Sequence, residues 1–137
     1  MFRSIVNTAC KLFEINRAQI DSLNVFPVPD GDTGTNMCFT IQSATKALAQ
    51  VQTNKMSDVA DAVSKGSLRG ARGNSGVILS QIMRGMCGSL KEYDEVDTCK
   101  FAKALQSAAE VAYGAVSVPK EGTILTVIKM IAEHAHS

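Results

Sequence analysis

Six stretches of this chain place apolar residues at the three-to-four-residue spacing of an amphipathic helix, and strand-like alternation is almost absent. The stretches begin near residues 2, 35, 57, 77, 98 and 123, and most connections between them are short. Short connections favour antiparallel neighbours, so we expect an all-α, up-and-down antiparallel bundle. A chain of 137 residues is long enough to form one domain with its own core.

Composition narrows the class of protein. Apolar residues make up 45% and charged residues 20%, as in ordinary soluble domains. The net charge of +1 gives no general attraction to nucleic acid or anionic membranes, and no stretch approaches the ~20 apolar residues of a membrane span. We expect a cytoplasmic protein whose scattered cysteines are reduced thiols, although sequence alone leaves a disulfide open. The cysteines are Cys10, Cys38, Cys87 and Cys99.

The segment over residues 23–37 cannot be helix or central strand at its start, because it contains two prolines and two glycines. It carries Asp30 and Asp32, one glycine apart, and a helical pattern follows at once. Residues 33–36 therefore lie near a helix N-terminus, where unpaired N–H groups suit phosphate. Hard carboxylate oxygens beside such a terminus favour Mg²⁺ or Ca²⁺. The pattern predicts a magnesium–nucleotide site, and a solvated turn is the plainer alternative.

Two further segments could bind a ligand. Residues 66–76 contain four glycines and two arginines and are expected to form a loop, either a flexible connector or a phosphate- or base-binding edge. The segment matches neither the Rossmann nor the Walker pattern. A third loop ends at Thr123, which could equally be a plain helix cap. The third expected helix, before residue 66, should be capped by Ser57 or Asp58. The fourth should end near residues 85–88, and Asp97 or Thr98 should cap the fifth.

Together the segments Leu23–Met37, Gly66–Gly85 and Pro119–Val127 resemble the nucleotide-binding domain of the dihydroxyacetone kinase L-subunit type. The chain looks closest to the N-terminal domain of the bacterial fatty acid kinase A subunit. The resemblance implies a barrel of eight antiparallel helices, with ATP or ADP bound at one end through two Mg²⁺ ions. Since six helices are expected here, it also implies a nucleotide-binding kinase domain over residues 1–137 that is cut at its C-terminal side. The last helix would then leave an apolar face uncovered, and the fragment would self-associate.

The resemblance also assigns site residues. Asp30 and Asp32 match metal-binding carboxylates, and Asn24 is the nearest counterpart of a third aspartate in the dihydroxyacetone kinases. Thr33 stands where those kinases carry a histidine. No residue is assigned to covalent or acid–base catalysis. The residues expected to bind nucleotide are Thr33, Gly34, Thr35, Asn36, Gly73, Asn74, Ser75, Gly76 and Thr123.

The function implied by the resemblance is phosphotransfer from ATP, which depends mostly on positioning and electrostatic stabilisation. The acceptor would be a fatty acid carboxylate presented by a separate fatty-acid-binding protein, with an acyl phosphate as product. Phosphorylation of dihydroxyacetone held on another subunit is the alternative within the same class. A non-catalytic nucleotide-binding regulatory module and a structural bundle with Ca²⁺ in the aspartate loop are alternatives of other classes. The isolated fragment is expected to be inactive, because the presenting partner is a separate protein.

Overall fold

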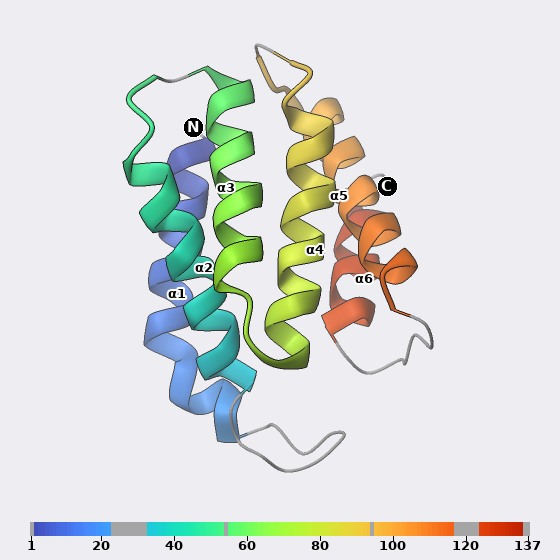
Figure 1. Cartoon of the computed structure of the whole chain (residues 1–137). Coiled ribbons are helices and arrows are strands. Elements are labelled where there is room, and N and C mark those ends of the chain that lie inside the picture. The colour runs from blue at the N-terminus through green and yellow to red at the C-terminus, as the bar shows by residue number, and fades with distance from the viewer. Residues whose placement is uncertain (1, 23–32, 54, 94, 117–123, 136–137) are drawn as a thin grey trace.

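The computed structural model describes residues 2–22, 33–53, 55–93, 95–116 and 124–135. Within these residues the chain forms six helices and no strand, and consecutive helices run antiparallel (Figure 1). The expected all-α, up-and-down bundle is confirmed. The helices are α1 (Phe2–Ser22), α2 (Thr33–Ala49), α3 (Met56–Gly70), α4 (Gly73–Leu90), α5 (Thr98–Gly114) and α6 (Ile124–Ala135).

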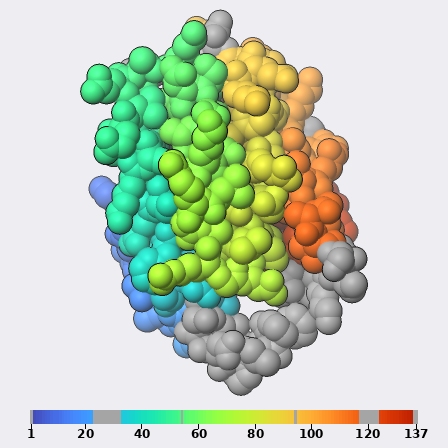
Figure 2. Space-filling view, in the orientation of Figure 1, coloured from blue at the N-terminus to red at the C-terminus, as the bar shows by residue number. Residues whose placement is uncertain are grey.

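Helix α4 holds the bundle together. Each helix packs against the next along the chain, and α4 also contacts α2 and α6. Figure 2 shows α3 and α4 side by side on one face of the molecule. A Cβ atom added at Gly85 would lie 2.7 Å from the Ser107 carbonyl oxygen and 2.8 Å from the Ala108 Cα atom. A glycine is therefore needed where α4 meets the backbone of α5.

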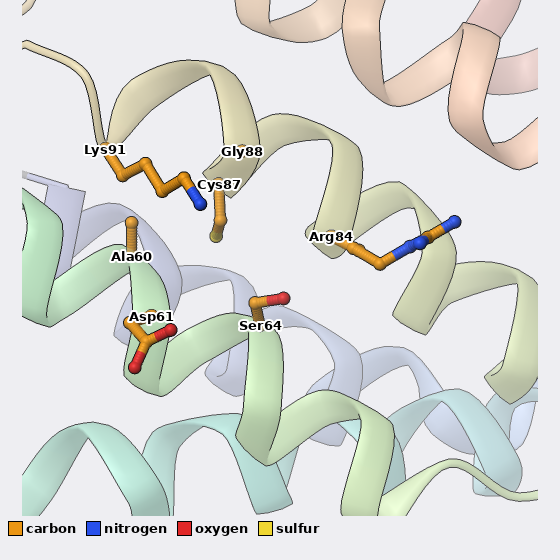
Figure 3. A pocket seen from close by; sticks show the side chains of 7 residues that line it. All are labelled: Ala60, Asp61, Ser64, Arg84, Cys87, Gly88 and Lys91. Atoms are coloured by element: carbon orange, nitrogen blue, oxygen red, sulfur yellow. The ribbon is translucent and has the colours of Figure 1, made fainter.

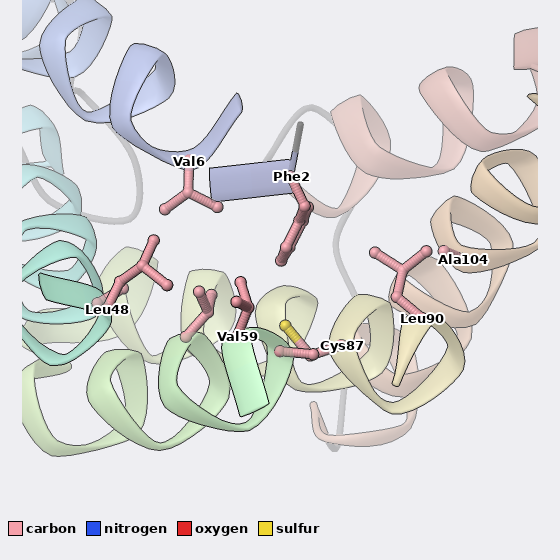
Figure 4. Packing of buried hydrophobic residues seen from close by; sticks show 10 residues of the cluster. Phe2, Val6, Leu48, Val59, Cys87, Leu90 and Ala104 are labelled. Carbon is pink, nitrogen blue, oxygen red and sulfur yellow. The ribbon is translucent and has the colours of Figure 1, made fainter. Parts of the chain in front are cut away.

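The hydrophobic core extends through all six helices in three clusters. The cluster in Figure 4 joins the N-terminal part of α1 to α2, α3, α4 and α5. Leu48 is 1% exposed and Leu90 is fully buried. Burying a side chain of that size stabilises the fold by roughly 1.5–3 kcal/mol. The labelled members of this cluster are Phe2, Val6, Leu48, Val59, Cys87, Leu90 and Ala104.

The loop expected over residues 66–76 is wrong in extent. Helix α3 continues to Gly70 and α4 begins at Gly73, so the connection between them is two residues long. A Cβ atom at Gly66 would lie 2.7 Å from the Ala47 Cβ atom and 2.9 Å from the Ser43 carbonyl oxygen. The glycines of this segment thus allow helices to approach closely, a role that a single sequence does not distinguish from flexibility. Helix α4 likewise continues through residues 85–88, where an end was expected.

The expected helix caps have mixed outcomes. Asp97 caps α5 as expected, and its side chain accepts a hydrogen bond of 2.8 Å from the Lys100 amide. The expected cap of α3 is wrong, because its N-cap residue is Lys55, which makes no side-chain capping bond. Asp58 lies inside the first turn of α3 instead and accepts a hydrogen bond of 2.8 Å from the Thr53 hydroxyl.

Helix α6 divides its apolar residues between two faces. Leu125, Ile128 and Ala132 are buried against the bundle, whereas Val127 and Met130 are 55% and 62% exposed. The uncovered apolar face expected for this helix included Ile128, and the expectation is wrong for that residue because it is buried against the bundle, whereas Val127 and Ile131 of the same stripe are exposed. None of the described helices is both long and apolar enough to cross a bilayer. Self-association stays a prediction.

Candidate functional site

The first turns of α2 and α4 meet at one end of the bundle, where α1 and α3 end (Figure 1). A Cβ atom at Gly76 would lie 2.6 Å from the Thr40 hydroxyl oxygen and 3.3 Å from the Asn36 carbonyl oxygen. The Asn36 side chain also fills the space that a side chain on Gly73 would need. The fold therefore brings Asn36 together with Gly73 and Gly76, although nearly forty residues separate them in sequence.

The start of α4 requires a glycine for two reasons. Gly73 has a φ angle of +65°, in the left-handed region that other residues rarely adopt. A Cβ atom there would also overlap the Asn36 amide group. In the first turn of α4, Asn74 is exposed and Ser75 is half-buried. The amides of a first turn have no partner within their own helix, so they are candidate donors to an anion.

The start of α2 is tied to the last turn of α1. The Thr35 amide donates to Asp21 Oδ1 at 2.9 Å, and the Thr35 hydroxyl donates to Asp21 Oδ2 at 2.6 Å. Partial burial acts to raise the pKa of Asp21, but hydrogen bonds from Thr35 and the Gly34 amide, together with the charge of Arg17, outweigh it and lower that pKa below its usual value. Since this carboxylate already occupies the Thr35 amide, a phosphate at the same terminus would have to displace it or use neighbouring donors.

Gly34 allows this contact. A Cβ atom at Gly34 would lie 2.9 Å from the Ile20 Cβ atom and 3.1 Å from Asp21 Oδ1, and it would press even closer on the Arg17 carbonyl oxygen. Only a residue without a side chain lets α2 begin this close to α1. Two candidate residues, Gly34 and Thr35, therefore have a structural role whether or not they touch a ligand.

Two arginines and a phenylalanine lie beside these helix starts. The guanidinium carbon of Arg72 lies 4.7 Å from the centroid of the Phe39 ring, and that of Arg17 lies 5.6 Å from it. Arg17 Nε also donates to the Thr35 hydroxyl at 3.0 Å. Phe39 is 37% exposed, so the ring is accessible at the surface.

The predicted metal ligands Asn24, Asp30 and Asp32 lie outside the described residues, as does Thr123, and their roles stay predictions. Within the described ranges, no group of three histidine, cysteine, aspartate or glutamate residues could hold a metal. Helix α6 begins at Ile124, which packs against the core cluster of α1, α2 and α4. The start of α6 therefore lies at the same end of the bundle as the starts of α2 and α4 (Figure 1).

Sequence reasoning missed four residues at this end of the bundle. One signal was available, because an acidic residue in the last turn of a helix opposes the helix dipole and suggests an outside partner. Asp21 occupies such a position. Nothing in the sequence could have paired the aromatic ring with both arginines, since their contacts join α1, α2 and the short connection before α4. The missed residues are Arg17, Asp21, Phe39 and Arg72.

A small hollow of about 110 Å³ lies between α3 and α4, closer to the other end of the bundle (Figure 3). It contains no candidate nucleotide-binding residue. Burial raises the pKa of the Cys87 thiol in its wall to about 12, so this thiol is neutral at physiological pH. The lining residues are Ala60, Asp61, Ser64, Arg84, Cys87, Gly88 and Lys91.

Comparison with known proteins places the chain in a family. It is 46% identical over 134 residues to "Protein YloV" of Bacillus subtilis, covering 98% of this chain and 24% of that protein. It is also 45% identical to an uncharacterised protein of Staphylococcus epidermidis and 43% identical to one of Staphylococcus aureus strain USA300, over 135 residues each. These alignments cover 98% of this chain and 24% and 25% of those proteins, so the chain spans about a quarter of the length of its curated relatives. The family model for the DAK2 domain matches residues 27–137, and the chain therefore belongs to the DAK2 domain family, the dihydroxyacetone kinase L-subunit type.

Proposed function

We propose that this domain binds ATP together with Mg²⁺ and supplies its γ-phosphoryl group to an acceptor held by another protein. The observation that carries the proposal is the contact of Asn36 with Gly73 and Gly76, which joins two candidate phosphate-binding segments at one end of the bundle. Two helix N-termini directed to one region offer several backbone donors and a partial positive charge to an anion. Membership of the DAK2 family supports a nucleotide as that anion.

The chain's own residues would divide the work. Asp30 and Asp32 would hold the metal, since carboxylate oxygens suit Mg²⁺, with Asn24 as a neutral third ligand. Bound Mg²⁺ supplies the positive charge that offsets the β- and γ-phosphates. Amides in the first turn of α4 would hold non-bridging oxygens, and the Thr35–Asp21 pair would keep α2 in position. Phosphoryl transfer of this kind needs no protein nucleophile, which agrees with the absence of an assigned catalytic residue.

The acceptor we propose is a fatty acid carboxylate presented by a fatty-acid-binding partner. The support is the resemblance to the fatty acid kinase branch. This chain has Asn24 near the position where dihydroxyacetone kinases carry a third aspartate, and that departure favours the fatty acid kinases. A carboxylate attacking the γ-phosphorus would give an acyl phosphate and ADP. Dihydroxyacetone on a partner subunit would give a phosphate ester instead.

Calorimetric titration of the chain with ATP, in Mg²⁺ and then in EDTA, tests the binding step. We expect binding only with Mg²⁺. At an ATP concentration a hundred times the dissociation constant, binding should raise the free energy of unfolding by about 2.7 kcal/mol. Asp32→Ala should abolish this binding while leaving the helical circular dichroism unchanged. Asp61→Ala is the matched control, since Asp61 is an exposed carboxylate on α3 that pairs with Lys65 at 3.1 Å. ATP binding that persists in EDTA or in Asp32→Ala would refute the metal assignment.

The acceptor needs a separate assay. The chain is mixed with ATP, Mg²⁺ and either a fatty-acid-loaded binding protein or a dihydroxyacetone-loaded subunit, and hydroxylamine traps any acyl phosphate as a hydroxamate. We expect the hydroxamate only when the fatty-acid-loaded partner is present, and none from the chain alone. A phosphate ester formed from dihydroxyacetone would favour the alternative kinase. Nucleotide binding without transfer to either acceptor would favour a regulatory module.

A further inference from the structure

The group formed by Arg17, Phe39 and Arg72 has no role in the core of the bundle. Phe39 belongs to none of the buried clusters, and both arginines are exposed. The three residues come from α1, α2 and the short connection before α4. They therefore meet only because the fold brings together the end of α1, the start of α2 and the start of α4.

Both guanidinium groups are held in place before any ligand arrives. A cation above an aromatic ring is attracted to the ring face, and planar guanidinium groups stack well on such rings. Arg17 is held further by its bond to the Thr35 hydroxyl. Arg72 directly precedes Gly73, whose conformation is restricted by the close approach of Asn36. Ordering these side chains in advance lowers the entropy cost of binding an anion.

The positive charge of the group is only partly balanced. Within the residues that the structure describes, the one ion pair within 4 Å joins Lys65 and Asp61 on α3. Asp21 interacts electrostatically with Arg17, but its oxygens accept hydrogen bonds from Thr35. Arg72 has the Phe39 ring as its described partner and no described carboxylate within ion-pair distance. Two guanidinium groups thus stand beside two helix N-termini, and both features favour negative charge.

We propose that Arg17 and Arg72, held on the Phe39 ring, recognise the phosphate charge of the bound nucleotide and set its preference for triphosphate over monophosphate. This inference rests on the proposed nucleotide-binding function and assigns a role to two arginines and a phenylalanine that are not among the residues expected to bind metal or nucleotide. Arginine binds phosphate oxygens through charge-assisted hydrogen bonds from a rigid planar group. Since the attraction grows with the number of phosphate charges, removing one arginine should weaken ATP more than ADP, and ADP more than AMP.

The test is a series of calorimetric titrations with ATP, ADP, AMP and adenosine at constant Mg²⁺ and ionic strength. We expect Arg72→Gln and Arg17→Gln each to weaken the binding of ATP about tenfold and that of AMP about twofold. The affinity for adenosine should not change. Arg84→Gln is the matched control, because Arg84 is an exposed arginine in α4 that lines the hollow beside α3. It should leave all four affinities unchanged.

Two further variants separate charge from packing. Phe39→Leu keeps both charges but removes the ring. We therefore expect a smaller loss of affinity, which is still largest for ATP, then ADP, then AMP. Arg72→Lys keeps one charge without the planar stack and should retain part of the preference for ATP. An equal loss for ATP and adenosine in Phe39→Leu would mean that the ring contacts the base, and it would overturn this proposal.

The outcomes distinguish this inference from the function on which it rests. If the wild-type chain binds Mg-ATP and the arginine variants bind it equally well, the inference is wrong and the proposed function stands. If the wild-type chain binds none of the four ligands, the proposed function fails and the inference fails with it. Melting temperatures of all variants identify any loss that comes from unfolding.

Discussion

Asp21 and Thr35 form a two-point contact between the last turn of α1 and the first turn of α2, with oxygen–donor distances of 2.9 Å and 2.6 Å. The acidic side chain opposes the dipole of its own helix but lies at the positive end of the next one. Ten residues separate the described end of α1 from the described start of α2, and those residues include Asp30 and Asp32. The pair therefore fixes both ends of the segment that carries the predicted metal ligands.

Removing the carboxylate charge should destabilise the fold. We expect Asp21→Asn to lower the free energy of unfolding by about 1–3 kcal/mol, because an amide offers one acceptor where the carboxylate offers two. Asp58→Asn is the matched control, since that exposed carboxylate accepts from a single threonine hydroxyl and should contribute less than about 1 kcal/mol. Urea unfolding at pH 7 measures both variants. Equal losses of unfolding free energy would mean that the Asp21 contact stabilises the fold no more than the Asp58 contact does.

The same contact predicts a pH dependence. Although partial burial opposes it, hydrogen bonding to Thr35 lowers the pKa of Asp21 in the folded state below its usual value of 3.8. The folded state thus releases this proton more readily than the unfolded state, so the stabilisation is complete above the unfolded pKa and is lost as the pH falls through the folded pKa. Wild type and Asp21→Asn should differ in unfolding free energy at pH 7 and converge as the pH falls below 3.8 and through the folded pKa. A constant difference from pH 7 to pH 2 would contradict this assignment.

Replacing two glycines of α4 by alanine should change the free energy of unfolding in opposite directions. Gly76→Ala places a Cβ atom 2.6 Å from the hydroxyl oxygen of the buried Thr40, which is itself held by the Asn36 carbonyl at 2.8 Å. We expect a loss of about 1–3 kcal/mol from overpacking. Gly88→Ala meets nothing within 4 Å and should stabilise the helix by about 0.5–1 kcal/mol. If urea unfolding shows a gain for both variants, α2 and α4 are not packed as closely as described.

The four thiols should differ in reactivity. All four cysteines are free, and only Cys99 is exposed. Burial raises the pKa of Cys87 to about 12, so at pH 8 this thiol has almost no thiolate to react. In the folded protein, Ellman's reagent should modify one thiol rapidly and the other three only under unfolding conditions. Cys99→Ser should remove the rapid phase, and a rapid phase that survives would show that another thiol is accessible.

The helical class, the number of helices and their antiparallel order could be predicted from the sequence, because apolar spacing and short connections depend on neighbouring residues alone. The first helix, residues 2–22, was placed correctly for this reason. The family could also be predicted, since its signature segments are themselves local in sequence. Asp97 was identified as a cap because a cap acts on amides two or three residues away.

Only the tertiary structure decided what the glycines do and which side chains gather at the end of the bundle. Gly66 and Gly76 look like loop residues in sequence, yet each lies within a helix that contacts α2. The contacts of Asp21 with Thr35, and of Phe39 with two arginines, join residues that are 14 to 33 positions apart. Such contacts depend on how far each helix extends and how closely it approaches the next, and both are set by side-chain packing over the whole bundle.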